Sequence, residues 1–129
     1  MGPLQILIAD DNPLVRYGLR ILLQRHEGWT VCGEAADGLE AVEKAASLKP
    51  NLILLDISMP KLDGLSALPL LREKAPDSGV IILTLFESLD IARTAASAGA
   101  RAYVAKSLLV TDLVPAIEAL QLTGNPARS

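Results

Sequence analysis

The chain is poor in several features that would each point to a class of protein. Aromatic residues make up 3% of its 129 residues, and it has one cysteine, Cys32, and one histidine, His26. A single cysteine excludes an intrachain disulfide and a cysteine metal cluster, and it favours a reducing compartment, so we expect a cytoplasmic protein. No apolar run approaches the roughly 18 residues of a membrane span, and residues 4–9 are too short for a signal peptide. We therefore expect no membrane association.

The chain also lacks an excess of basic residues. Its formal net charge is −3, and no basic stripe runs along it, so we expect no direct binding of nucleic acid by this chain. Hydrophobic residues reach 50% of the composition, which is enough for the core of one domain. With so few aromatic residues, that core must consist of Leu, Ile, Val and Ala, and this composition suits a parallel sheet covered by helices.

The stretch Leu52–Pro60, LILLDISMP, is the most informative segment. Four apolar residues run without alternation into one carboxylate, Asp56, and a proline stands just before the run as well as at its end. This pattern is typical of a buried central strand rather than a helix. Open α/β sheets place their chemistry at the carboxyl ends of such strands, although a lone Asp there can equally start a turn.

The rest of the chain alternates strands with helices. Apolar runs predict strands over 5–9, 29–35, 52–56, 80–85 and 102–105. Helical spacing predicts helices over 13–26, 38–48, from the 61–64 loop to about 74, over 89–98, and from a Thr111 cap to about 122. Five βα units predict an α/β fold: a five-stranded, doubly wound parallel sheet of the flavodoxin-like type with strand order 2-1-3-4-5.

Three details of the helices are also expected. Leu14 belongs to the buried positions of the first helix by its apolar character. Pro69 lies inside the third helix, so we expect a late start or a bend there. Pro115 should fall in the first turn of the fifth helix, where a missing N–H matters least, if Thr111 caps that helix.

Polar residues end the predicted strands in a chemically compatible set. Strand one ends in Asp10 and Asp11, strand three in Asp56, strand four in Thr84 and strand five in Lys106. If strands one and three are neighbours in a parallel sheet, the three carboxylates lie close together. A set of oxygen ligands without His or Cys selects a hard cation, Mg²⁺ or Mn²⁺. A metal, a carboxylate nucleophile, a lysine and a hydroxyl are the parts of a phosphoryl-transfer site.

Four segments carry a family resemblance, and they cover nearly the whole chain in order. They read IADDNP at 8–13, LLDISMPKLDG at 54–64, LTLFES at 83–88 and AGARAYVAKS at 98–107. The chain resembles the receiver domain of a two-component response regulator. The segments DDNPLVRYGL at 10–19 and AGARAYVAKS are similar to the NarL/FixJ-like subfamily, whose members usually carry a helix-turn-helix output domain.

This resemblance implies a phosphorylation-dependent switch rather than an enzyme. Asp56 would be the phosphoacceptor, taking a phosphoryl group from a sensor histidine kinase. Asp11, together with Asp10 mostly through water, would hold Mg²⁺ with Asp56 and the main-chain carbonyl of Ser58. The chain would thereby assist its own phosphorylation and dephosphorylation.

The resemblance also implies how the signal leaves the site. Lys106 would pair with the phosphoryl oxygens, and Thr84 would move to hydrogen-bond them, which lets Tyr103 turn inward. The face made by helix four, strand five and helix five would then change and control an output domain (most often in transcription) or a downstream partner. Phosphorylation-linked homodimers occur in this family.

Two positions tune dephosphorylation in the family, and here they hold Ser58 and Phe86. We expect the bulky Phe86 to hinder the attacking water, so a Phe86→Glu variant should release phosphate faster. We expect residues 1–122 to form the receiver domain and residues 123–129 to be a tail or the start of a linker. The chain is then either a stand-alone receiver or a fragment cut at a linker.

Three alternatives remain from the residues themselves. A haloacid-dehalogenase-type phosphatase would need a second Asp two residues after the nucleophile, where this sequence has Ser58. A nucleotide- or flavin-binding domain would need a Gly- or Ser/Thr-rich loop after strand one instead of Asp-Asp-Asn-Pro. A degenerate receiver could act through protein contacts alone, although the complete set of strand-end residues argues against it.

Overall fold

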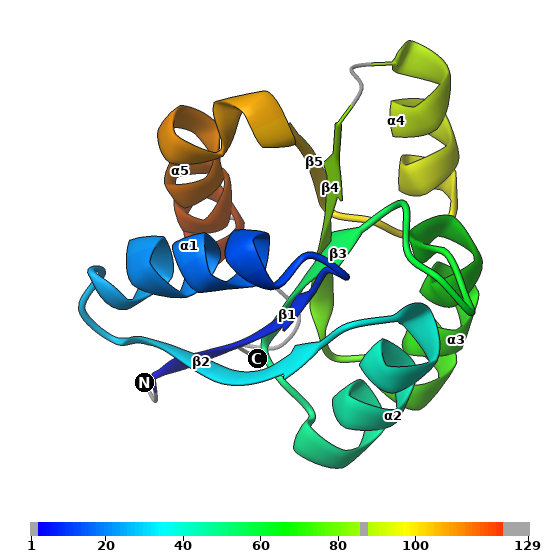
Figure 1. Cartoon of the computed structure of the whole chain (residues 1–129), viewed down its shortest axis with the longest axis horizontal. Helices are drawn as coiled ribbons and strands as arrows, with labels where there is room; N and C mark the ends of the chain where they lie inside the picture. Colours follow the sequence, from blue (N-terminus) through cyan, green and yellow to red (C-terminus); the bar gives the residue numbers. More distant parts are fainter. Residues whose placement is uncertain (1–2, 86–87, 123–129) are drawn as a thin grey trace.

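The computed structural model describes residues 3–85 and 88–122, so Phe86 and the 123–129 tail lie outside the described residues. Strands and helices alternate along the chain (Figure 1). The strands are β1 (Leu4–Ala9), β2 (Trp29–Ala35), β3 (Leu52–Asp56), β4 (Gly79–Thr84) and β5 (Ala102–Ala105). The helices are α1 (Pro13–Gln24), α2 (Gly38–Leu48), α3 (Gly64–Lys74), α4 (Leu89–Ser97) and α5 (Leu109–Leu122), the last preceded by a 3₁₀ turn, Lys106–Leu108.

The strands form a single parallel sheet in the order β2-β1-β3-β4-β5. This confirms the predicted α/β fold and strand order. β1 lies next to β3, so the ends of these two strands, at Ala9 and Leu55, are register partners. Since all strands run the same way, the residues that follow them gather at one edge of the sheet.

Alternating residues of β1 point to opposite faces of the sheet and pack in two separate apolar layers. Ile6 and Ile8 of β1 pack in the layer beneath α1 and α5, whereas Leu7 and Ala9 pack in the layer beneath α2, α3 and α4. Figure 1 shows the two groups of helices on opposite faces of the sheet. Every residue of β3 is buried, which explains why its sequence shows no polar alternation.

The first helix is shorter than predicted and buries a different stripe. Asn12 caps it, its side chain accepting the Leu14 N–H at 2.9 Å, and the helix ends at Gln24 rather than at His26. Leu19 and Leu23 are buried, but Leu14 is 78% exposed, so its predicted burial is wrong. Leu14 lies five residues before Leu19, which is about 140° around the helix and away from the sheet.

Two helices, α3 and α5, hold a proline in their interior, and neither starts late. α3 starts at Gly64, capped by Asp63, so of the two outcomes expected from Pro69 the late start is wrong and the bend stays a prediction. α5 starts at Leu109 because it continues directly from the 3₁₀ turn after β5. Thr111 is therefore not the cap, and Pro115 lies inside α5. None of the helices in the described part of the chain has the length and apolar character needed to cross a membrane.

The second strand contains an irregularity at the cysteine. Ile6 pairs with Val31 but Leu7 pairs with Gly33, so Cys32 is an extra residue in β2. Such a bulge bends the strand and turns a side chain away from the regular alternation. Cys32 is therefore half-buried rather than part of the core.

Candidate functional site

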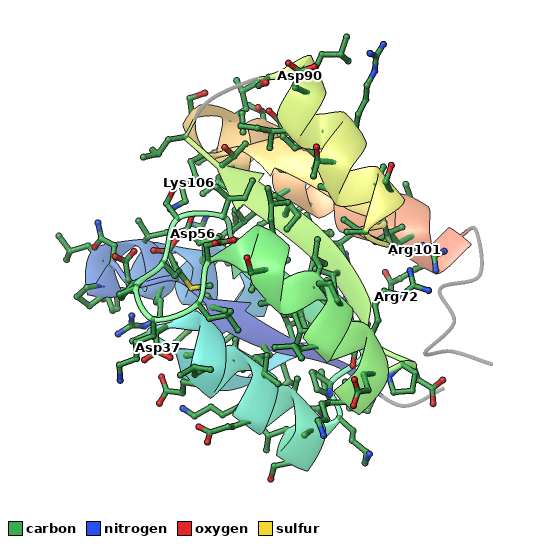
Figure 2. The ribbon with its side chains drawn as sticks, turned by 90° about the vertical axis from the view of Figure 1, so that its right-hand side faces the viewer. Asp37, Asp56, Arg72, Asp90, Arg101 and Lys106 are labelled. Atoms are coloured by element: carbon green, nitrogen blue, oxygen red, sulfur yellow. The ribbon has the colours of Figure 1, made fainter. Side chains whose placement is uncertain are left out.

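The carboxyl edge of the sheet brings together the polar residues at the ends of four strands. Asp10 follows β1, Asp56 ends β3, Thr84 ends β4 and Lys106 follows β5. Asp10 and Thr84 have no exposed surface, and Asp56 is 3% exposed. Figure 2 shows Asp56 and Lys106 close together at this edge. Buried polar groups of this kind need partners, so their contacts determine what the site can do.

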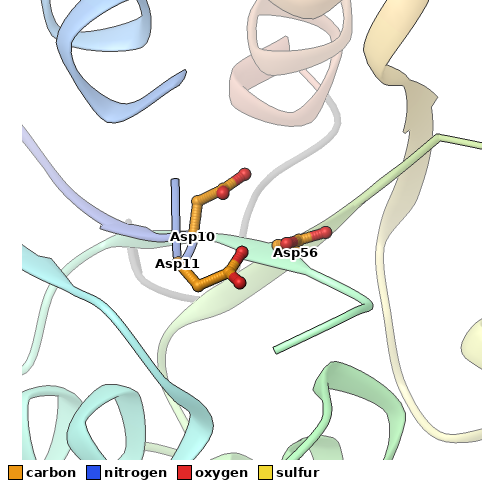
Figure 3. A group of neighbouring side chains, drawn as sticks. All are labelled: Asp10, Asp11 and Asp56. Carbon is orange, nitrogen blue, oxygen red and sulfur yellow. The ribbon is translucent and has the colours of Figure 1, made fainter. Parts of the chain in front are cut away.

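Three carboxylates form the acidic part of the site. One oxygen from each of Asp10, Asp11 and Asp56 lies within 4.8 Å of the others (Figure 3). Asp10 and Asp56 are buried, whereas Asp11 is exposed and leaves the cluster open on one side. An all-oxygen set with an open side fits a hard cation that keeps several waters, as Mg²⁺ does.

Lys106 provides the positive charge next to these carboxylates. Its Nζ lies 2.7 Å from Asp10 Oδ2 and 3.2 Å from Asp56 Oδ1, and its side chain is 12% exposed. Burial by itself would lower the pKa of Lys106, but the hydrogen bond and charge of Asp10, and then those of Asp56, outweigh it and raise the pKa. Lys106 is therefore an ammonium group at neutral pH, and it bridges the carboxylates of Asp10 and Asp56.

The Asp56 carboxylate has one oxygen in contact with the backbone of its own loop. The Ser58 N–H donates to Asp56 Oδ1 at 3.3 Å. Burial, followed by the charge of Asp10, raises the pKa of Asp56, while Lys106 and the Ser58 N–H act in the opposite direction. An ionised Asp56 is thus held in a place where its charge costs free energy, and a cation at the cluster would relieve that cost.

The β3–α3 loop, residues 57–63, is held by its backbone. The Ile57 N–H donates to Leu83 O at 3.0 Å, and the Gly64 N–H donates to Ile57 O at 2.9 Å. A Cβ at Gly64 would lie 2.3 Å from Asp56 O, so only glycine allows this close approach. The loop that carries Ser58 is therefore placed tightly against the end of β3.

Tyr103 of β5 reaches the loop that follows β4. Its hydroxyl oxygen accepts a hydrogen bond from the Ser88 N–H at 2.9 Å, and its ring is half-buried against the α2–α3–α4 layer. Ser88 in turn caps α4, its hydroxyl accepting the Ile91 N–H at 3.3 Å. The tyrosine expected to respond to the site is thus tied to the start of α4, two strand ends away from Asp56.

Two residues of the site were missed by the sequence analysis. Arg16 of α1 donates through Nη1 to Asp10 O at 2.6 Å and through Nε to Glu34 Oε1 at 2.9 Å. Glu34, near the end of β2, also accepts from Arg20 Nε at 2.8 Å. The only sequence signal is the spacing of four residues between the two arginines, which places both on one side of the helix. Nothing in the sequence indicates that β2 supplies their partner.

Comparisons with known proteins agree with this architecture. Residues 6–118 match the family model of the response regulator receiver domain. The chain is 43% identical over 118 residues to the transcriptional regulatory protein PdtaR of Mycobacterium tuberculosis, covering 90% of this chain and 56% of PdtaR. It is 37% identical over 115 residues to the nitrate/nitrite response regulator protein NarL of Escherichia coli, covering 89% of this chain and 53% of NarL.

A solved structure shows the same fold. The CheX-CheY-BeF3-Mg²⁺ complex from Borrelia burgdorferi contains a chain that is 26% identical and superposes with a TM-score of 0.87, covering 93% of this chain and 90% of that chain. The fold and site together define a phosphorylation-based signalling module. The chain belongs to the receiver-domain family of two-component response regulators, and NarL is among its relatives. It spans about half the length of the curated relatives it matches.

Proposed function

We propose that this receiver domain accepts a phosphoryl group on Asp56 from a phosphohistidine of a sensor kinase. The observation that carries this proposal is the buried Asp56 with Lys106 Nζ at 3.2 Å and two further carboxylates beside it. An Asp56 oxygen would form a bond to phosphorus as the phosphorus–nitrogen bond of the phosphohistidine breaks. The products are an aspartyl phosphate and a free histidine.

The residues around Asp56 would have separate roles in metal binding, in orienting the carboxylate and in pairing with the phosphoryl group. Asp10, Asp11, Asp56 and the main-chain carbonyl of Ser58 would hold Mg²⁺, with Mn²⁺ as a substitute. When bound, the metal ion supplies charge neutralisation for the phosphoryl oxygens. The Ser58 N–H and Lys106 Nζ lie on the same oxygen, Asp56 Oδ1, and so orient the carboxylate. Lys106 is then placed to pair with the phosphoryl oxygens once they carry the new charge.

Phosphorylation would change the molecule through Thr84 and Tyr103. Thr84 is fully buried at the end of β4, one strand from Asp56, where its hydroxyl can meet the new acceptor oxygens. A shift of the end of β4 would move Ser88, whose N–H donates to the Tyr103 hydroxyl. This hydrogen bond, at the start of α4, would then break and free the Tyr103 side chain to turn inward. The α4–β5–α5 face would then be the surface that a partner reads.

We further infer that residues 1–122 act as the receiver unit and that 123–129 begin a linker. PdtaR is described as a transcriptional regulatory protein and NarL as a response regulator, and each is about twice as long as the match. By analogy, this domain would control an output domain in transcription, with a phosphorylation-linked homodimer as one route. Phe86 remains a proposed brake on the phosphorylated lifetime.

Intact mass after incubation with acetyl phosphate and Mg²⁺ tests the proposal. Wild type should gain one phosphoryl group, and Asp56→Asn should gain none. The adduct should also disappear in EDTA and weaken in Asp11→Asn, because the proposed metal site loses its cation or one ligand. A wild-type chain without any adduct at saturating donor and metal would instead support the degenerate receiver, which acts through protein contacts alone.

A further inference from the structure

Arg16 has a place in the structure that differs from that of an ordinary surface arginine. It lies on α1 with its side chain 18% exposed, between the end of β2 and the end of β1. Its Nε donates to Glu34 Oε1 at 2.9 Å, and its Nη1 donates to Asp10 O at 2.6 Å. One planar guanidinium thus bridges a carboxylate on one strand and a main-chain carbonyl on the next.

The carbonyl that Arg16 holds belongs to the peptide group that joins the two acidic residues. Asp10 O and the N–H of Asp11 lie in the same planar unit, so fixing that oxygen fixes the direction in which the chain leaves towards Asp11. The other polar groups of Asp10 are also engaged: its N–H donates to Ala35 O at 3.0 Å, its Oδ1 accepts the Asn12 N–H at 2.9 Å, and its Oδ2 forms the ion pair with Lys106 Nζ at 2.7 Å. Arg16 completes this set.

Glu34 keeps the guanidinium in place. Arg20 donates to Glu34 from the neighbouring turn of α1, and Lys44 of α2 donates to Glu34 O. Arg20 therefore holds the Glu34 carboxylate, and Lys44 holds the main-chain carbonyl of the same residue. Arg16 and Arg20 share Glu34, but of the two only Arg16 also hydrogen-bonds to Asp10 in the described structure.

We propose that Arg16 is a positioning residue for the acidic cluster: by holding the Asp10 carbonyl against Glu34, it sets the Asp10–Asp11 peptide so that both carboxylates face Asp56. This inference rests on the proposed metal site. Coulomb's law alone assigns Arg16 the opposite effect, since a positive charge near three carboxylates opposes the binding of a cation. The sign of the effect therefore separates positioning from simple charge.

The test uses Arg16→Gln, Arg16→Lys and Arg20→Gln in the chain as it stands. Thermal unfolding is followed in EDTA and in rising MgCl₂, so that the stability of the apo protein and its Mg²⁺ affinity are read separately. Arg16→Gln should raise the Kd for Mg²⁺ about 10-fold, as loss of a residue that orients metal ligands does. Arg16→Lys should also weaken binding, because one ammonium cannot bridge both acceptors with a planar fork.

Arg20→Gln is the matched control, since it removes the same charge and two hydrogen bonds to the same Glu34 but no hydrogen bond to Asp10. Its affinity for Mg²⁺ should equal or exceed that of wild type. In ¹H–¹⁵N spectra recorded in EDTA, the Asp11 amide should shift in Arg16→Gln and not in Arg20→Gln. This second readout needs neither metal nor phosphodonor, and it applies to Arg16→Lys if Arg16→Gln does not fold.

Two results would overturn the proposal. One is an Arg16→Gln protein that binds Mg²⁺ as tightly as wild type or more tightly, and the other is an equal loss of affinity in Arg20→Gln. Both leave the proposed function standing if wild type still forms the Asp56 adduct. A wild-type protein that binds Mg²⁺ but gains no phosphoryl group overturns the proposed function and leaves the positioning by Arg16 intact.

Discussion

The β1–α1 loop and the β3–α3 loop both bring carboxylates to one edge of the sheet, but different forces hold them. The first has a backbone hydrogen bond from Asp10 to Ala35 O and depends in addition on charged side chains, with Arg16 between Asp10 O and Glu34. The second is held by backbone hydrogen bonds and by close approaches that only glycine permits, at Gly38 and Gly64. The first loop should therefore fail when a charge is removed, and the second when a single carbon is added.

Lys106 connects the two loops, so its loss should have the largest effect. It contacts Asp10 after β1 and Asp56 at the end of β3, and both carboxylates are buried. Lys106→Met would leave them without their counter-charge, which should lower the free energy of unfolding by about 3 kcal/mol in EDTA. Urea denaturation at pH 7 measures this. Because the pKa of Lys106 is raised, its contribution is fully present at pH 7 and is lost only in alkali as pH rises through the folded-state value.

A second substitution checks the cause of that loss. Asp56→Asn in the Lys106→Met background removes one of the two unpaired charges and should recover much of the stability. In the wild-type background, Asp56→Asn should raise the melting temperature in EDTA, because burial and Asp10 raise the pKa of Asp56 and so make its ionised form costly. A Lys106→Met protein as stable as wild type would show that the ion pairs do not join the loops.

Adding one carbon at the first residue of α2 or α3, each of which packs against the β3–α3 segment, should have the next largest effect. A Cβ at Gly64 would lie 2.3 Å from Asp56 O, and one at Gly38 would lie 1.8 Å from Leu62 O, both of them backbone atoms. Gly64→Ala and Gly38→Ala should each cost about 1–3 kcal/mol, since the backbone must shift. Gly18→Ala on α1 is the control: nothing lies within 4 Å of its Cβ, and it should stabilise by about 0.5–1 kcal/mol. Chemical denaturation measures the change in the free energy of unfolding for all three variants. An equal change in Gly18→Ala would show that the close backbone contacts at Gly38 and Gly64 are not the cause.

The pH dependence of stability should report on the ion pairs of Glu34 with Arg16 and Arg20, which hold the β1–α1 loop. The pKa of Glu34 is lowered from its usual 4.5, chiefly by the hydrogen bond from Arg20. Burial acts in the opposite direction, and the hydrogen bond from Arg16 lowers the pKa further. A lowered pKa means that the stabilisation is complete above about 4.5 and is lost as pH falls through the folded-state value. Glu34→Gln should therefore cost about 1 kcal/mol at pH 7, a small figure because these groups are partly exposed. The difference from wild type should vanish in acid, and a pH-independent difference would exclude the ion pairs as its source.

The exposed ion pair of the β3–α3 loop should matter least. Lys61 lies 3.5 Å from Asp37 but is 66% exposed, and its backbone has φ = 67°. Lys61→Gly removes a pair with an exposed lysine but relieves a left-handed backbone, so the two effects on stability should nearly cancel. Lys61→Ala keeps the backbone strain without the pair and should be the less stable of the two. Thermal unfolding compares them, and a more stable Lys61→Ala would show that the pair outweighs the backbone.

Much of the fold was predictable because its signals are local. The unbroken apolar run of β3, the caps at Asn12 and Ser88, and the glycines after helices identify elements from neighbouring residues alone. The errors also have local causes. Leu14 was assigned to the core by its apolar character although it lies off the buried stripe, and the start of α5 was misplaced because a 3₁₀ turn connects it to β5.

The sequence by itself determined the order of strands and helices, and it placed Asp10, Asp56, Thr84 and Lys106 at the strand ends, because parallel strands put their ends at one edge. Only the tertiary structure decided which long side chains meet across elements. Arg16 and Glu34 are separated by 18 residues, and their contact depends on how α1 packs beside β2. The approach of Gly38 to Leu62 O depends likewise on how α2 docks against the β3–α3 loop. Contacts of this kind follow from packing geometry, and no local pattern encodes them.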